Sequence, residues 1–161
     1  MIIAPHVAFF GDGKGHPTCM PMTEPRLASS AIVHRDGRYL LVRRANPPAA
    51  DLFAFPGGRA EAGETAADTA LRELLEETGI AGSNPRLFET VELLPEPGLA
   101  GSHYILSVFL VDAAADSLAC ADSDALEAGW YLPEEALAMP IPDSVRACLL
   151  RLAPNSLEVI A

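Results

Sequence analysis

Hydrophobic residues along this chain fall mainly into short runs separated by Gly, Pro and Asp, a pattern typical of β-strands and turns. Asp36-Gly37 separates the first two runs and predicts a two-residue hairpin, because both turn positions favour positive φ. A loop rich in Pro and Gly at residues 95–102 separates two longer runs. The predicted strands are residues 30–34, 38–43, 52–55, 87–94, 103–111, 118–121 and 128–131.

Between Thr65 and Gly79 the hydrophobic positions change to helical spacing. Thr65 is a candidate N-cap with Asp68 in the first turn, and Gly79 suits the left-handed end of a helix. Shorter helices are predicted at residues 133–139 and 144–152, the second with Asp143 as a candidate N-cap. The face of the first helix predicted to pack on a sheet consists of Ala67, Ala70, Leu71, Leu74 and Thr78.

These elements predict one α+β domain over residues 28–161. Residues 1–27 contain Gly and Pro without a sustained period, and we expect them to form an N-terminal arm or extension. Half of the 161 residues are hydrophobic and a fifth are charged, which is sufficient for a folded core.

The charge of the chain excludes several classes of partner. Asp and Glu number 22 against 11 Lys and Arg, a net charge of −11. A surface of this sign argues against binding to a nucleic-acid backbone or to an anionic membrane. No apolar stretch is long enough to span a bilayer. The three cysteines (Cys19, Cys120 and Cys148) form no CxxC pair, so we expect a cytoplasmic protein without a disulfide framework.

Three glutamates of the first helix form an acidic face. Glu73, Glu76 and Glu77 are three or four positions apart or adjacent, so they lie on one side of the helix, where Arg72 neutralises only part of their charge. Such a face can simply be solvated, or it can bind a hard divalent cation through carboxylate oxygens. A preceding Gly57-Gly58 turn, which offers a backbone carbonyl nearby, favours the metal site.

The same residues spell a known motif. Gly58, Glu64 and the run from Arg72 to Ile80 match the pattern G-x5-E-x7-R-E-U-x-E-E-x-G-U at every defined position, where U is a hydrophobic residue. The chain therefore resembles the Nudix hydrolases. That resemblance implies an α/β/α sandwich in which a mixed β-sheet lies between helices, from about residue 28 to residue 152.

The resemblance also implies a reaction and its residues. Nudix hydrolases cleave nucleoside diphosphates linked to another moiety and use Mg²⁺ or Mn²⁺. Carried onto this chain, the catalytic residues are Glu73, Glu76, Glu77 and Arg72, the last as a partner that orients a glutamate. The implied metal ligands are Gly57 through its carbonyl, Glu64, Glu73, Glu76 and Glu77. The implied substrate-binding residues are Arg43, Arg44, Gly58 and Glu96.

Two details of this site stay open in the sequence. Arg43 and Arg44 are strand neighbours that point in opposite directions, so one of them is expected to face the site. The catalytic base varies within the family. The candidates here are Glu73, Glu96, Asp122, Asp124 and Glu127.

The substrate is the least determined property. Pro95 lies fifteen residues after Ile80, a spacing that resembles ADP-ribose pyrophosphatases and favours ADP-ribose or a related nucleotide sugar. Alternatives are a house-cleaning enzyme for non-standard nucleoside triphosphates and a catalytically silent nucleotide sensor. The intact motif and the length of the chain favour the hydrolase over the sensor. The expected partner is a small nucleotide, with neither nucleic acid nor membrane, and the resemblance allows a homodimer.

Overall fold

The first β-sheet of the protein brings together strands that are distant in the chain. A computed structural model describes residues 24–47, 49–95 and 101–154. In this sheet the order is β5-β1-β7-β6, with β1 and β7 parallel and the other pairs antiparallel. The four strands are β1 (Arg26–Ile32), β5 (Gly57–Arg59), β6 (Gly82–Leu93) and β7 (Tyr104–Ala113).

The second sheet is antiparallel and is built around β3, which pairs with three other strands. Its members are β2 (His34–Arg35), β3 (Arg38–Arg44), β4 (Phe53–Ala54) and β8 (Ala125–Tyr131). The Asp36-Gly37 hairpin is confirmed, since both residues have positive φ, 49° and 76°. The predicted strand 30–34 is divided, however, because β1 joins the first sheet while β2 belongs to the second.

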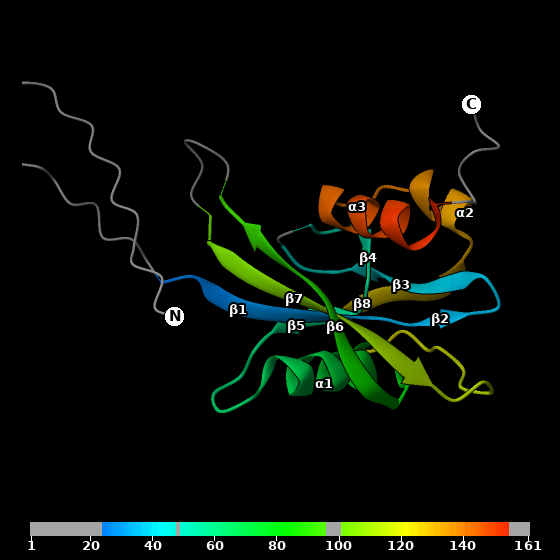
Figure 1. Cartoon of the computed structure of the whole chain (residues 1–161), viewed down its shortest axis with the longest axis horizontal. Helices are drawn as coiled ribbons and strands as arrows, with labels where there is room; N and C mark the ends of the chain where they lie inside the picture. The colour runs from blue at the N-terminus through cyan, green and yellow to red at the C-terminus, as the bar shows by residue number, and fades with distance from the viewer. Residues whose placement is uncertain (1–23, 48, 96–100, 155–161) are drawn as a thin grey trace, which may run out of the picture.

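Helices cover the sheets from opposite sides, which confirms the α/β/α arrangement (Figure 1). The helix α1 (Ala66–Thr78) packs on one side, and α2 (Pro133–Leu137) and α3 (Asp143–Leu152) pack on the other. Two hydrophobic clusters separate the layers, one containing Leu74 of α1 and the other Leu149 of α3. Among the described residues, no helix combines the length and the apolar character needed to cross a bilayer.

The long helix ends where the sequence predicts. The Thr65 side chain accepts a hydrogen bond from the backbone N–H of Asp68, and Gly79 adopts the left-handed conformation with a φ of 71°. Its buried face differs from the predicted one, because Ala67 and Leu71 are only half-buried while Glu77 is buried.

Two other local predictions are wrong. Residues 118–121 form no strand. They pass the end of α1, where Cys120 donates its backbone N–H to the Thr78 carbonyl at 3.0 Å, satisfying a helix carbonyl instead of a neighbouring strand. Asp143 is the first residue of α3 and not its N-cap. Pro142 occupies that position and makes no side-chain capping bond.

Candidate functional site

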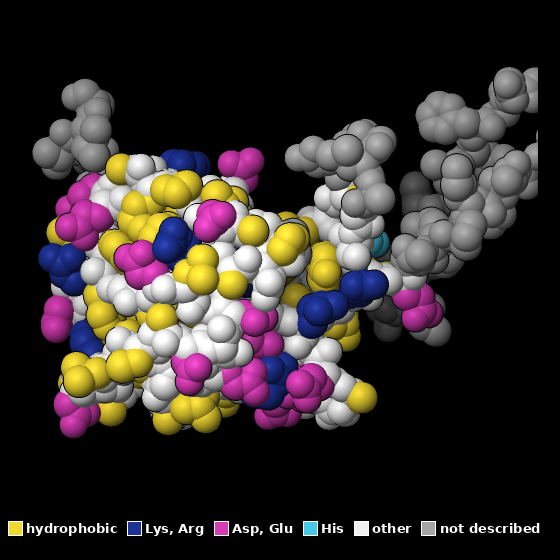
Figure 2. Space-filling model, turned by 180° about the vertical axis from the view of Figure 1, so that it is seen from behind, with side chains coloured by type: hydrophobic (Ala, Val, Ile, Leu, Met, Phe, Trp, Pro, Cys, Tyr) yellow, Lys and Arg dark blue, Asp and Glu magenta, His cyan; other side chains and the backbone are white. Residues whose placement is uncertain are grey.

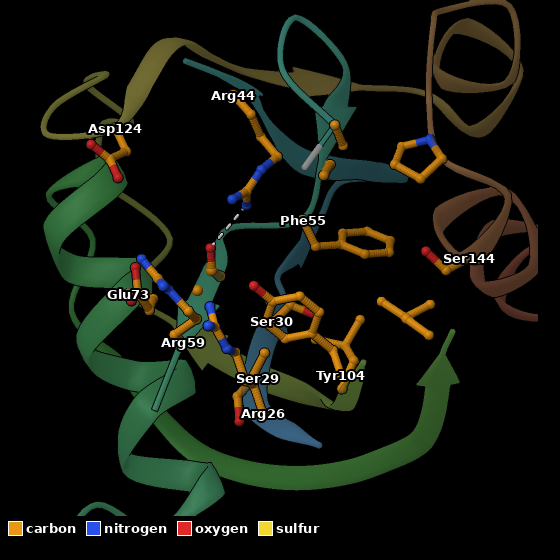
Figure 3. Close-up of a pocket in the computed structure, with 18 of the residues that line it drawn as sticks. Arg26, Ser29, Ser30, Arg44, Phe55, Arg59, Glu73, Tyr104, Asp124 and Ser144 are labelled. Carbon is orange, nitrogen blue, oxygen red and sulfur yellow. Dashed lines mark hydrogen bonds between the residues drawn. The ribbon is translucent and has the colours of Figure 1, made fainter. Parts of the chain in front are cut away.

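A cleft of about 1200 Å³ opens between the first sheet, the glutamates of α1 and the start of α3. Strands β1, β5 and β7 form much of its lining, and Figure 3 shows side chains from these strands, α1 and α3 facing it. The motif residues of the chain are therefore brought to a concave surface, which is where small ligands bind in most proteins.

Gly57 and Gly58 bring the backbone of β5 against its neighbours. A Cβ atom at Gly57 would lie 2.5 Å from the Ser29 carbonyl oxygen, and one at Gly58 would lie 2.5 Å from the carboxyl carbon of Glu73. A larger residue at Gly57 would therefore push β5 away from β1, and one at Gly58 would displace the Glu73 carboxylate. The Gly57 N–H donates to a Glu77 carboxylate oxygen at 2.9 Å, and the Gly57 carbonyl accepts from Arg44 at 3.1 Å (Figure 3).

Arg72 connects three of the predicted carboxylates. Its guanidinium donates to Glu64 at 2.6 and 3.0 Å, to Glu73 at 2.9 Å and to Glu76 at 3.0 Å, and also to the Arg59 carbonyl at 3.0 Å. These bonds hold the pKa of Glu64 at about 2, chiefly through Arg72. Figure 2 shows acidic side chains gathered around basic atoms along the lower edge of the molecule, the side on which α1 lies.

Two glutamates of this cluster are held away from water. Glu77 is 3% exposed, and burial raises its pKa to about 7 despite its bond from the Gly57 N–H. Burial also raises the pKa of Glu73, although Arg72 opposes the effect. A buried carboxylate without a full counter-charge is costly, and a bound cation would remove that cost.

The donor set of the cleft fits a hard divalent cation. Glu73, Glu76 and Glu77 supply carboxylate oxygens, and Gly57 supplies a carbonyl, which are the ligand types that Mg²⁺ and Mn²⁺ prefer. Glu64 is less available, because Arg72 and Thr69 already bind its oxygens. Within the described part of the chain, no three acidic, His or Cys side chains already converge as a metal-ligand group, so the glutamates would have to turn.

The raised pKa of Glu77 yields a test of its burial in the metal-free protein. Its pKa moves from an ordinary 4.5 to about 7 in the fold. Glu77 thus keeps its proton in the folded protein at pH values where the unfolded chain has lost it. The contribution of Glu77 to the free energy of unfolding is fully present below pH 4.5 and is lost as pH rises through 7. The effect corresponds to about 3 kcal/mol at most. We expect Glu77→Gln to raise the free energy of unfolding by roughly 1–3 kcal/mol at pH 8 in EDTA, measured with urea.

The same comparison at pH 4 provides the control, because Glu77 is then mostly protonated in both the folded and the unfolded wild type, and the two proteins should be nearly equal in stability. A glutamine carbonyl can still accept the Gly57 N–H. Equal stability at pH 8, or a loss there, would show that Glu77 is not held in a desolvated state.

The structure separates the two neighbouring arginines as strand geometry predicts. Arg44 lines the cleft. Arg43 is not among the described residues that line it; its guanidinium lies 3.8 Å from Glu127 and 3.9 Å from Asp51. The expectation that Arg43 binds substrate therefore does not fit its position, because successive strand residues face opposite sides.

Some of the candidate catalytic bases line the cleft and others do not. Glu73 and Asp124 line the cleft, and the charge of Asp124 contributes to the raised pKa of Glu77. Asp122 accepts the backbone N–H of Ser123, Glu127 accepts the hydroxyl of Tyr131, and neither is among the described residues that line the cleft. Glu96 lies outside the described residues, whereas Pro95 lines the cleft.

Several residues that line the cleft could not be identified as site residues from the sequence. Arg26 falls in the predicted arm but belongs to β1, and Arg59 occupies an undefined position of the motif. Tyr104 is the first residue of β7 and Ser144 is the second residue of α3, and local spacing does not show what either element packs against. Pairing between distant strands places Arg26, Arg59 and Tyr104 in the cleft, and the packing of α3 places Ser144 there.

Comparisons with known proteins agree with this geometry. A family model described as NUDIX domain matches residues 24–152. An ADP-ribose pyrophosphatase from Methanocaldococcus jannaschii is 33% identical over 108 residues, which cover 66% of this chain and 62% of that protein. A NAD-capped RNA hydrolase, NudC, from Chromobacterium violaceum is 27% identical over 142 residues, which cover 88% of this chain and 51% of that protein.

A solved structure shares the arrangement of the elements. The MutT NUDIX hydrolase from Burkholderia pseudomallei superimposes with a TM-score of 0.70 at 27% identity, covering 79% of this chain and 97% of that one. The chain spans about half to three fifths of the length of the two curated relatives above. Similarity to those relatives is therefore similarity to a part of each.

Proposed function

Since this chain belongs to the Nudix family, we propose that it hydrolyses a phosphoanhydride bond in a nucleoside diphosphate linked to another moiety. The observation that carries the proposal is the meeting of Glu73, Glu76 and Glu77 with the Gly57 carbonyl and Arg44 in one cleft. This arrangement places carboxylates for a divalent cation beside a guanidinium for phosphate, which is what phosphoanhydride hydrolysis requires.

Each residue would have a distinct part in the reaction. Glu73, Glu76, Glu77 and the Gly57 carbonyl would hold Mg²⁺ or Mn²⁺. When bound, such an ion neutralises phosphate oxygens and lowers the pKa of the attacking water. Arg72 and Glu64 would keep the glutamates oriented through the bonds described above. Arg44 would contact the diphosphate, and the proton of the water would pass to Glu73 or Asp124, the two candidate bases in the cleft.

ADP-ribose or a related nucleotide sugar is the substrate class that we propose first. Two observations support it: the similarity to a protein named ADP-ribose pyrophosphatase, and the position of Pro95 in the lining of the cleft. A house-cleaning activity on non-standard nucleoside triphosphates and a silent sensor are the alternatives. The net charge of −11 favours a small nucleotide over RNA.

A hydrolysis panel tests the proposal. The full chain would be assayed with Mg²⁺ on ADP-ribose, nucleotide sugars, NAD, NADH, a NAD-capped RNA, and canonical and oxidised nucleoside triphosphates. Release of AMP and ribose phosphate from ADP-ribose would support the proposed class, and release of pyrophosphate from a triphosphate would favour the house-cleaning alternative. Binding without turnover on any substrate would favour the sensor. The expected homodimer stays a proposal, which sedimentation velocity would test.

A further inference from the structure

Two arginines of the first sheet lie together on the wall of the cleft. Arg26 and Ala28 are two residues apart on β1, so their side chains lie on the same face of the sheet. Arg59 of β5 is the antiparallel partner of Ala28. Arg26 and Arg59 are therefore diagonal cross-strand neighbours, with a Cα separation of roughly 7–8 Å. Both line the cleft, and Figure 3 shows their side chains next to each other. Two guanidinium groups at this spacing can reach one anionic group.

Neither arginine is neutralised by a carboxylate of the part of the chain that the structure describes. Within the described ranges, the side chains of Arg26 and Arg59 form no ion pair and no hydrogen bond. Five other arginines do pair with carboxylates of described residues, namely Arg38, Arg43, Arg72, Arg86 and Arg151. The chain holds 22 acidic residues against 11 basic ones, so carboxylates are abundant. Like charges at neighbouring positions of a sheet repel each other, and an external anion would relieve that repulsion.

The pair is displaced from the centre of the proposed reaction. Gly57 and Arg59 lie on the same face of β5, two residues apart, which separates their Cα atoms by about 7 Å. Arg26 lies further along the same direction, beside its parallel partner Tyr104. This distance between Gly57 and Arg59 is closer to the width of a sugar ring than to the distance between the two phosphorus atoms of a diphosphate. A diphosphate held at Gly57 and Arg44 would thus leave the pair for another group of the same substrate.

We propose that Arg26 and Arg59 form a second anion subsite, which binds a phosphate or carboxylate carried by the moiety linked to the nucleoside diphosphate. The inference rests on the proposed function, because it needs the diphosphate of the substrate to be held at Gly57 and Arg44. Within the proposed class of nucleotide sugars, it predicts a preference for members whose linked sugar carries an additional phosphate or carboxylate. Tyr104, also in the lining, lies beside the same subsite.

Matched ligand pairs test the subsite through binding, independently of turnover. Calorimetric titration in EDTA at low ionic strength would compare ADP-ribose 1″-phosphate with ADP-ribose, and UDP-glucuronate with UDP-glucose. We expect the anionic member of at least one pair to bind roughly tenfold more tightly, the value of a charge-assisted hydrogen bond or two. The first pair reports on phosphate and the second on carboxylate. Salt should weaken the preference.

Substitutions then assign the preference to the two arginines. The double variant Arg26→Gln/Arg59→Gln should bring the affinity ratio of the preferred pair close to one, and each single variant should lower it. Arg38→Gln is the matched control, because it also removes one positive charge but lies outside the cleft lining, paired with Glu135. Equal affinities within both pairs, or a preference that survives in the double variant, would overturn the subsite.

Comparing kcat/KM for the two ligands of each pair distinguishes a failure of the subsite from a failure of the proposed function. A wild type that hydrolyses both members equally, with no difference in affinity, would retain the function and lose the subsite. A wild type that binds the anionic member more tightly but hydrolyses neither would retain the subsite and lose the function.

Discussion

Glu76→Gln is expected to lower kcat by roughly two to four orders of magnitude at saturating Mg²⁺ while leaving the fold intact. The Glu76 side chain is half-exposed, and its carboxylate is bound by Arg72 at 3.0 Å, so its contribution to packing is small. An amide in its place keeps the shape but loses the charge that a divalent cation needs. Steady-state rates on the best substrate of the panel, together with a thermal unfolding curve, measure the two effects.

Glu134→Gln is the matched control for this substitution. Glu134 is an exposed residue in the first turn of α2, and the change again removes one negative charge. It should leave both kcat and the unfolding temperature unchanged. Full activity of Glu76→Gln at saturating Mg²⁺ would contradict the assignment of Glu76 as a metal ligand.

Arg72→Met is expected to lower the free energy of unfolding by about 2–3 kcal/mol and to reduce kcat as well. The substitution removes a guanidinium that is only 21% exposed and leaves Glu64, Glu73 and Glu76 without their shared counter-charge. Breaking a buried ion pair by removing one partner costs about 3–5 kcal/mol, and partial exposure here places the effect at the lower end. Urea denaturation in EDTA measures the loss of stability.

Arg72→Lys distinguishes charge from geometry at this position. Lysine keeps the positive charge but cannot donate to Glu64 through two nitrogens while also reaching Glu73. We expect intermediate stability and a kcat that is still reduced, because the glutamates lose their orientation. If Arg72→Met were as stable and active as the wild type, the bonds of Arg72 would have neither the structural nor the orienting role inferred here.

The sequence by itself determined the features that depend on local spacing. The Asp36-Gly37 hairpin and both ends of α1 follow from the φ preferences and capping bonds of neighbouring residues. The acidic face of α1 follows from helical periodicity, and the motif from Gly58 to Ile80 identified the family that the comparisons confirm. Each of these signals lies within one turn or one short segment, so no knowledge of distant contacts is needed.

The tertiary structure decided which side chains meet in the cleft. Arg26 and Arg59 become neighbours only through the register of β1 with β5, and residues 118–121 lose their strand only because they pass the end of α1. Glu77 is buried because Gly57 packs against it, which no periodicity in α1 indicates. Strand pairing and desolvation depend on residues that are far apart in the chain, and therefore neither can be derived from the pattern of a single segment.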